Sequence, residues 1–197
     1  VPPGPSHPRR ARRNPDARPG DRLILGKPLG VGVLSAALKK QALDAAGYER
    51  MIATTTRLNT PGPDLAALEG VHALTDITGF GLAGHALELA RGAGVTVQLD
   101  WSRVPLLAGV ADLAAAGHVT GASGRNWAGY GEQVVLPDGF GATSQALLAD
   151  PQTSGGLLVS CSPESVPEVL RVFRAHGFED AAEIGEVAAG PARLVVR

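Results

Sequence analysis

The sequence has one cysteine, few aromatic residues and no long apolar run, and each scarcity excludes a class of protein. Cys161 alone cannot form an internal disulfide or a multi-cysteine metal site. An aromatic content of 4% argues against stacking on nucleic-acid bases. No apolar run approaches the roughly 18 to 20 residues of a membrane helix, and the N-terminus lacks the apolar centre of a secretory signal. We therefore expect a cytoplasmic protein with no membrane and no nucleic-acid partner.

Residues 1–20 differ in composition from the rest of the chain. They hold six prolines and five arginines, with almost no large apolar side chain, so we expect a disordered or extended segment. Its basic run, formed by Arg9, Arg10, Arg12 and Arg13, is interpreted as a solvated tail rather than a nucleic-acid contact. Without residues 1–20 the formal charge of −1 becomes −5. Residues 21–197 are predicted to form a single, mildly acidic domain.

The stretch from Val71 to Arg91 combines an apolar strand, an acidic turn, three spaced glycines and an amphipathic helix. Gly79, Gly81 and Gly84 allow sharp turns or close approach of a ligand, and a helix N-terminus attracts anions. A carboxylate at such a place repels phosphate but can hold the Mg²⁺ that accompanies it, so Asp76 is a candidate metal ligand. The alternative is a tight turn in which Asp76 only caps the helix.

A second polar turn covers residues 150–156, with the sequence DPQTSGG, and leads directly into an apolar strand. It is interpreted either as a nest of backbone N–H groups facing an anion or as a tight corner between a helix and a strand. Near the N-terminus, a strand at 21–27, the turn Pro28–Gly32 and a helix at 35–46 repeat the strand–glycine–helix order. Lys27 could pair with a phosphate there, but the turn lacks the length and ending of a P-loop, which favours a structural role.

A nicotinamide dinucleotide-binding domain is a weaker alternative. Residues 79–84 match G-x-G-x-x-G, and Asp100 follows a second apolar run at the expected distance. However, Asp76 would place a negative charge where the pyrophosphate should approach. This mismatch disfavours the dinucleotide interpretation.

The remaining pattern alternates strands and helices, which predicts an α+β class with a mixed sheet layered with helices. We expect helices at 48–59, 105–116 and 167–176, a strand at 95–100, a loop at 121–131, and a closing strand pair at 182–187 and 192–197. His85 is expected to be a neutral, packed ring and Cys161 a small apolar filler. The pattern contains no catalytic triad.

Four blocks of this sequence resemble selenophosphate synthetase, also called selenide, water dikinase, of the aminoimidazole ribonucleotide synthetase superfamily. They are ILGKPLGVGVL, LTDITGFGLAGHALELAR, the loop with Gly124, Arg125 and Asn126, and LLADPQTSGGLL. The resemblance runs from about Pro19 to the C-terminus and covers the family's C-terminal domain. It implies the fold of that domain.

The resemblance also implies a function. Such enzymes are dimers that use ATP, Mg²⁺, selenide and water to make selenophosphate, AMP and phosphate. The family's reactive cysteine and essential lysine have no counterpart here, so we assign no catalytic residue and expect no turnover by the chain alone. The family's magnesium-binding aspartate corresponds to Asp76. The predicted nucleotide-binding residues are Thr78, Gly79, Gly81, Thr153, Ser154, Gly155 and Gly156.

Two partners are compatible with this assignment. The chain could work with an N-terminal ATP-binding domain or as part of a homodimer. A non-catalytic binding or dimerisation module that pairs with a separate ATP domain remains an alternative from a different functional class.

Overall fold

The computed structural model describes residues 12–197, and the basic residues Arg9 and Arg10 lie outside this range. Seven strands form one mixed sheet in the order β2-β5-β1-β6-β3-β7-β4. The neighbours from β2 to β3 run antiparallel, whereas β3, β7 and β4 are parallel to one another. The strands are β1 (Arg22–Leu25), β2 (Val71–Asp76), β3 (Thr96–Leu99), β4 (Val134–Val135), β5 (Leu157–Cys161), β6 (Ala182–Ala188) and β7 (Arg193–Val196).

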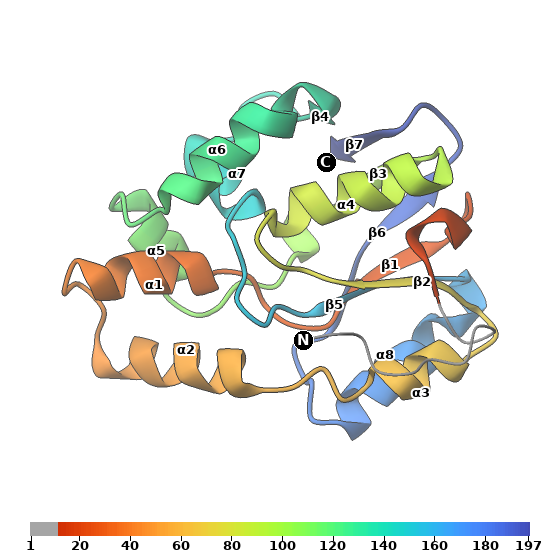
Figure 1. The fold of residues 1–197 in the computed structure, drawn as a ribbon, viewed down its shortest axis with the longest axis horizontal. Coiled ribbons are helices and arrows are strands. Elements are labelled where there is room, and N and C mark those ends of the chain that lie inside the picture. Colours follow the sequence, from red (N-terminus) through yellow and green to blue (C-terminus); the bar gives the residue numbers. More distant parts are fainter. Residues whose placement is uncertain (1–11) are drawn as a thin grey trace.

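Helices surround this sheet on both faces and beyond one end (Figure 1). In the described part of the chain they are α1 (Val31–Lys39), α2 (Ala45–Thr56), α3 (Gly62–Ala67), α4 (Gly81–Ala93), α5 (Val110–Ala115), α6 (Gly121–Tyr130), α7 (Ala142–Leu148) and α8 (Val166–Ala175). The predicted α+β class with a mixed sheet is confirmed. No helix within residues 12–197 is long and apolar enough to cross a membrane.

The central strand β1 is buried on both faces, which explains its continuous apolar sequence. Leu23 and Leu25 join the core beneath α4, whereas Ile24 joins the core beneath α3 and α8. Successive side chains of a strand point to opposite faces, so one short strand supports both layers. Figure 1 shows α4 on one side of the sheet and α3 and α8 on the other.

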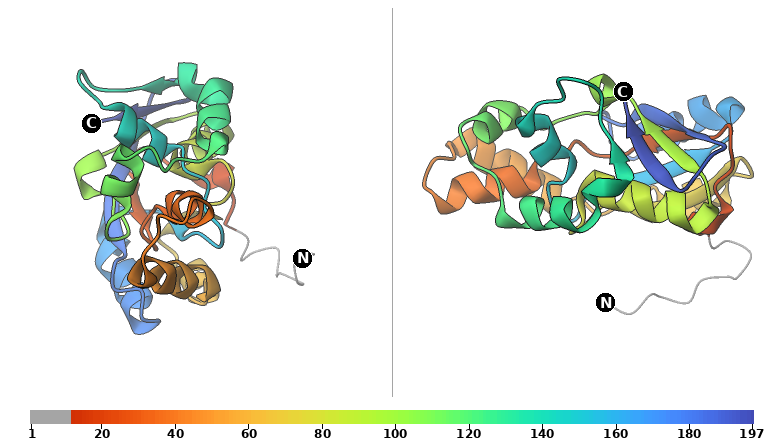
Figure 2. Two further views of the ribbon diagram at one scale, coloured as in Figure 1. Left: turned by 90° about the vertical axis from the view of Figure 1, so that its left-hand side faces the viewer. Right: turned by 90° about the horizontal axis from the view of Figure 1, so that it is seen from above.

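A third apolar cluster lies beyond the end of the sheet, where α1, α2, α5 and α7 pack together. Val33 and Leu34 of α1 contact Val110 of α5 and Leu147 of α7 in this cluster. The right-hand view in Figure 2 shows these helices grouped away from α8. The loops that connect the sheet to α1 and α4 therefore lie between two packed bodies of the domain.

Three sequence-based expectations about local structure were wrong. Residues 121–130 form helix α6 rather than a loop, because the Thr120 side chain accepts a hydrogen bond from Ser123 N (3.1 Å) and starts the helix despite its glycines. The final strands β6 and β7 are not paired with each other, since β3 lies between them. Helix α5 begins at Val110 because residues 105–107 are extended and bond to Leu29.

The part of the N-terminal segment that the structure describes is packed, contrary to expectation. Asn14–Asp16 form a 3₁₀ turn, and Ala17 is buried in the core beneath α4. Arg12 donates hydrogen bonds to the carbonyls of Ala66 (3.0 Å) and Leu68 (2.9 Å). Composition did not reveal this packing, because one small apolar residue and one arginine are sufficient to attach the segment. The expectation for residues 1–11 lies outside the described residues.

The sheet topology contradicts the dinucleotide alternative. In a dinucleotide-binding unit the strand after the glycine-loop helix lies parallel and close to the strand before it. Here β2 precedes the glycine loop and β3 follows its helix, yet β5, β1 and β6 lie between them. Asp100 consequently lies several strands away from the loop and cannot meet a ribose bound there.

Candidate functional site

Three loops interlock at one edge of the sheet. They are the β1–α1 turn (residues 26–30), the β2–α4 loop (residues 77–80) and the α7–β5 loop (residues 149–156). Ile77 N donates to Gly156 O (2.9 Å), and Gln152 N donates to Thr78 O (3.0 Å). The polar turn DPQTSGG therefore lies directly against the central glycine motif, as a shared site would require.

The α7–β5 loop closes the N-terminus of α1 with its own side chains. Asp150 Oδ2 accepts hydrogen bonds from Gly32 N (3.0 Å) and Val33 N (3.4 Å), and Gln152 Oε1 accepts from Gly30 N (3.2 Å) and Val31 N (3.3 Å). The first N–H groups of a helix otherwise lack partners, so these two side chains replace any external anion. Lys27 and the glycines beside it do not form a phosphate cradle.

Asp150 is fully buried, and its charge is costly there. Burial raises the pKa of Asp150 to about 7, although hydrogen bonds from Gln152, Val33 and Gly32 lower it. Its Oδ1 atom is buried and has no hydrogen-bond partner among the described residues. The strength with which Asp150 holds the N-terminus of α1 therefore depends on whether Asp150 is protonated.

The N-terminus of α4 is left open by contrast. Within residues 12–197 no side chain accepts a hydrogen bond from the first turn of this helix. Asp76, at the end of β2, is exposed, and its carboxylate makes no hydrogen bond or ion pair in the described part of the chain. An exposed, unpaired carboxylate beside a helix N-terminus that no side chain in this range caps is available to a metal ion and to the anion that it accompanies.

His85 fixes the geometry of this open end. Its Nε2 atom accepts a hydrogen bond from Thr78 N (3.0 Å) and lies 3.0 Å from Thr78 Oγ1. A backbone N–H can only donate, so Nε2 carries no proton, and Nδ1–H donates to Glu88 Oε2 (2.9 Å). The interpretation of His85 as a neutral packed ring agrees with this bonding. The Thr78 N–H group is occupied and cannot itself bind an anion.

The glycines of the two polar loops differ in how much space a side chain would find. A Cβ on Gly155 would collide with the carbonyl of Ile77, and one on Gly156 would collide with the backbone of Lys27. Gly81 has a φ of +70° and lies against the backbone of Ala149. A Cβ on Gly79, however, would meet no atom within 4 Å. Only Gly79 leaves open space above the backbone.

Lys27 is buried, and its ammonium group connects two segments of the chain. Its ammonium group donates to the carbonyls of Ser154 (2.6 Å), Arg57 (2.7 Å) and Thr54 (3.3 Å). Burial, with a smaller contribution from Arg57, lowers the pKa of Lys27 to about 8. The lysine thus closes the C-terminus of α2 and holds Ser154 in its left-handed conformation with a φ of +52°.

The eight predicted site residues are brought together, but they differ in accessibility. Asp76, Gly79 and Thr153 are exposed, and Thr78 and Ser154 are half-buried. Gly81, Gly155 and Gly156 are buried. Their roles as metal and nucleotide ligands remain predictions.

The sequence-based reasoning missed the residues that order these loops, namely Asp150, Gln152 and Asn126. Asn126, on α6, donates through Nδ2 to the carbonyls of Gly79 (2.8 Å) and Ala149 (3.1 Å). These bonds hold the exposed β2–α4 loop in place. The unusual density of polar residues at 150–156 was the available signal. Cys161 is fully buried, and burial, with Asp21 and Glu183 adding to the effect, raises the pKa of its thiol to about 12, so the apolar-filler interpretation agrees with the structure.

Comparison with known proteins now identifies the domain. Residues 18–197 match the family model described as AIR synthase related protein, C-terminal domain. The chain belongs to this family. The resemblance inferred from the four sequence blocks is thereby confirmed.

Curated relatives of this AIR synthase related domain carry the name "Selenide, water dikinase". The relative from Burkholderia pseudomallei is 66% identical over 190 residues, which is 96% of this chain and 54% of that protein. The relative from Pseudomonas straminea is 58% identical over 190 residues, with 96% and 53% covered. The chain therefore spans about half the length of the curated relatives it matches.

Solved structures share the fold of this AIR synthase related domain at low sequence identity. The hydrogenase maturation protein HypE in complex with ATP is 21% identical, with a TM-score of 0.68 over 93% of this chain and 49% of that chain. The thiamine-monophosphate kinase from Stenotrophomonas maltophilia is 17% identical, with a TM-score of 0.63 over 93% and 52%. These likenesses establish the architecture alone.

Proposed function

We propose that this chain acts as the C-terminal portion of a selenide, water dikinase, which uses ATP to phosphorylate selenide and releases AMP and phosphate. In this proposal, Asp76 binds the metal ion, and the open N-terminus of α4 faces the metal-bound polyphosphate. The observation that carries the proposal is the exposed, unpaired Asp76 carboxylate at that helix end, in a chain 66% identical to a named selenide, water dikinase.

The residues present fit a shared magnesium ion. The described part of the chain contains no group of three or more His, Cys, Asp or Glu side chains that could enclose a metal, so the metal would need further ligands besides Asp76. Mg²⁺ usually takes one or two protein carboxylates and fills its octahedron with water and phosphate oxygens. When bound, Mg²⁺ neutralises charge on the phosphates. Asp76 would supply one oxygen ligand, and Thr153 and Gly79 would border the phosphate.

Phosphoryl transfer demands positioning and charge neutralisation more than covalent chemistry from the protein. The interlocked loops suit that demand, because Thr78 is fixed by His85 and by Gln152, and Gly79 is fixed by Asn126. A rigid turn reduces the reorganisation needed when the polyphosphate binds. The proposed nucleotide-facing residues are those with backbone or hydroxyl groups on this turn.

The test uses a chimera in which the N-terminal part of the Burkholderia pseudomallei relative precedes residues 18–197 of this chain. We expect selenide-dependent and Mg²⁺-dependent release of AMP from ATP. Asp76→Asn keeps the size of the side chain but removes its charge. It should lower turnover by about tenfold or more and raise the Mg²⁺ concentration needed for half-maximal rate, since losing even an outer partner of a metal typically costs about 10- to 100-fold.

Asp138→Asn is the matched control, because Asp138 is exposed in a loop and makes no hydrogen bond or ion pair in residues 12–197. It removes the same charge and should leave turnover and Mg²⁺ dependence unchanged. If Asp76→Asn behaves like Asp138→Asn in an active chimera, the metal role of Asp76 is wrong.

A further inference from the structure

A pocket lies between α2, the β1–α1 turn, the segment 106–108 and the turn after α8. Its volume is about 420 Å³. Small-molecule sites in proteins commonly begin at about 300 Å³, so the pocket can hold a small ligand. None of its lining residues is among the eight residues predicted from the sequence as metal or nucleotide ligands.

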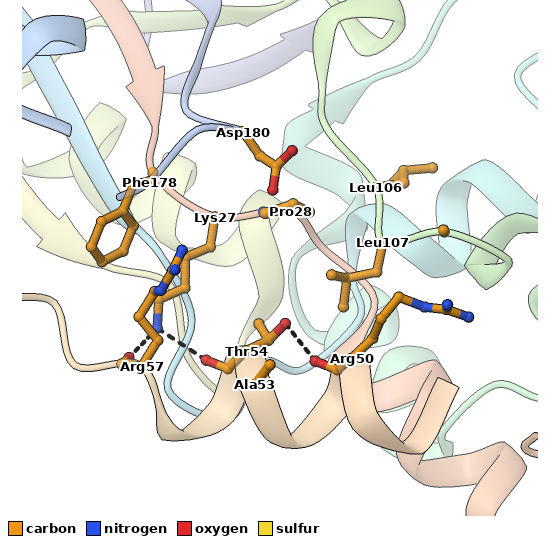
Figure 3. A pocket seen from close by; sticks show the side chains of 12 residues that line it. Lys27, Pro28, Arg50, Ala53, Thr54, Arg57, Leu106, Leu107, Phe178 and Asp180 are labelled. Carbon is orange, nitrogen blue, oxygen red and sulfur yellow. Dashed lines mark hydrogen bonds between the residues drawn. The ribbon is translucent and has the colours of Figure 1, made fainter. Parts of the chain in front are cut away.

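The charge around this pocket is mainly positive. Lys27, Arg50 and Arg57 line it, together with a single acid, Asp180, which Figure 3 shows across the pocket from α2. Within residues 12–197 none of the three cationic side chains forms an ion pair with a carboxylate. Cations in a concave site without paired carboxylates favour an anionic ligand.

Arg57 is held in place before any ligand binds. Its Nη1 atom donates to Gly177 O (2.8 Å), and its guanidinium carbon lies 5.1 Å from the centre of the Phe178 ring. These contacts restrict the side chain and leave its other N–H groups available. A planar, pre-oriented guanidinium is well suited to bind an oxyanion through two parallel hydrogen bonds.

Arg50 has one buried donor that lacks a hydrogen-bond acceptor. Its Nε atom is buried and has no hydrogen-bond partner among the described residues. Leaving a buried donor of a charged group unpaired is costly. Figure 3 shows the Arg50 side chain pointing away from Lys27 and Arg57, so Arg50 adds positive charge at the other side of the pocket. An anion beside Arg57 would lie near the buried ammonium group of Lys27, whose own donors are occupied by carbonyl groups.

The remaining wall is apolar. Pro28, Ala53, Leu106 and Leu107 line the pocket beside the charged groups. Figure 3 shows Leu107 facing α2 across the hollow. A ligand with both a compact apolar part and an oxyanion would match both surfaces.

We propose that this pocket binds a small organic monophosphate, with Arg57 contacting the phosphate beside the positive charge of Lys27, and the wall formed by Pro28, Ala53, Leu106 and Leu107 contacting the apolar body. Lys27 contributes its positive charge and positions the C-terminus of α2. The proposal does not depend on the function proposed above, because it involves different residues and requires no metal.

Calorimetric titration of the 197-residue chain tests the proposal. The probes are phenyl phosphate, inorganic phosphate and phenol, in a buffer that contains EDTA so that no metal site contributes. Phenyl phosphate should bind saturably, roughly tenfold more tightly than inorganic phosphate, because its ring removes apolar surface from water. Phenol should not bind measurably. Added NaCl should weaken the binding of phenyl phosphate, as expected for an ionic contact.

Arg57→Gln should weaken binding of phenyl phosphate by about tenfold or more, the cost of one charge-assisted hydrogen bond, whereas Arg50→Gln should weaken it less because Arg50 lies at the other side of the pocket. Arg57→Lys keeps the charge but not the planar fork, so its affinity should fall between those of the wild type and Arg57→Gln. Arg174→Gln is the control, since Arg174 is exposed on α8 and does not line the pocket. Thermal unfolding of each variant verifies that it is folded.

Three results would overturn the proposal. The first is the absence of binding of either phosphate to the wild type. The second is binding that Arg57→Gln weakens no more than Arg174→Gln does, which would place the phosphate elsewhere. The third is equal affinity for phenyl phosphate and inorganic phosphate, which would exclude the apolar body.

Discussion

Two regions of this domain repeat the same order of strand, glycine turn and helix, but within the described residues only one of the two helices has its N-terminus capped by side chains. At β1–α1 the helix N-terminus is closed by Asp150 and Gln152 and is buried. At β2–α4 no side chain in residues 12–197 closes the helix, and Asp76 and Gly79 are exposed beside it. The α7–β5 loop contacts both regions. Its side chains cap the N-terminus of α1, and none of them caps the N-terminus of α4.

The difference shows that a glycine turn before a helix is not by itself a binding site. At the closed end the helix N–H groups already have a carboxylate and an amide as partners, so an external anion would have to displace a buried side chain. At the open end no side chain in residues 12–197 accepts a hydrogen bond from the first turn of the helix. Occupancy by the protein's own side chains is therefore what distinguishes a structural turn from a candidate ligand site.

The largest predicted effect is a dependence of the free energy of unfolding on pH, caused by Asp150 at the closed end. Burial raises the pKa of Asp150 from 3.8 to about 7. A carboxyl group with a raised folded-state pKa contributes stability that is fully present below pH 3.8 and is lost as the pH rises through 7. The change corresponds to about 4 kcal/mol. Urea unfolding of the wild type and of Asp150→Asn at several pH values between 4 and 8 measures it.

Asparagine cannot ionise, so Asp150→Asn should remove this dependence. Relative to the wild type, the variant should be most destabilised near pH 4, where both side chains are neutral and the amide leaves a buried donor unpaired. The difference in free energy of unfolding should shrink, or change sign, toward pH 8. Parallel pH profiles for the two proteins would contradict the closed-end description.

A smaller effect separates the glycines of the two regions. Gly155→Ala places a Cβ against the carbonyl of Ile77 and the Cβ of Gln152, whereas Gly79→Ala places one in open space. We expect Gly155→Ala to lower the free energy of unfolding by about 2 kcal/mol through overpacking. Gly79→Ala should change it by less than about 0.5 kcal/mol. Urea unfolding at one pH compares them, and equal losses would remove the distinction between closed and open loops.

The smallest effect is expected at the metal candidate itself. Asp76 is exposed and unpaired in the described residues, so Asp76→Asn should alter the free energy of unfolding of the chain by no more than about 0.5 kcal/mol. Asp138→Asn gives the matched baseline in the same urea titration. A loss of more than about 1 kcal/mol specific to Asp76 would indicate a helix-capping role and would make the two helix ends more alike than the structure suggests.

Sequence patterns predicted most of the elements but fewer of their partners. The helix at 167–176 was found within one residue because its apolar side chains recur at helical spacing. The strand at 95–100 and the strand after Gly156 were found for similar local reasons. The helix at 121–130 was missed because glycines suggested a loop, while its start depends on one Thr120 cap. The pairing of β3 between β6 and β7 joins distant segments and has no local signal.

The candidate site divides in the same way. Asp76 and the two polar loops could be selected from residue types and from the resemblance of four sequence blocks. That Asp150 is a buried cap, that His85 fixes Thr78, and that Lys27 closes α2 could not be predicted. The roles of Asp150 and Lys27 depend on hydrogen bonds between residues distant in sequence and on the burial of a charge, and the role of His85 depends on how the loop before α4 folds back over seven residues.

The sequence by itself determined which family this domain belongs to, the alternation of its strands and helices, and the residue types at its polar turns. These properties follow from local periodicity and from short motifs, which persist whatever lies opposite them. Only the tertiary structure decided which of the two glycine turns is open. The decision depends on where the α7–β5 loop places one carboxylate and one amide, because a helix end can bind a ligand only when the folded chain has not already supplied its acceptors.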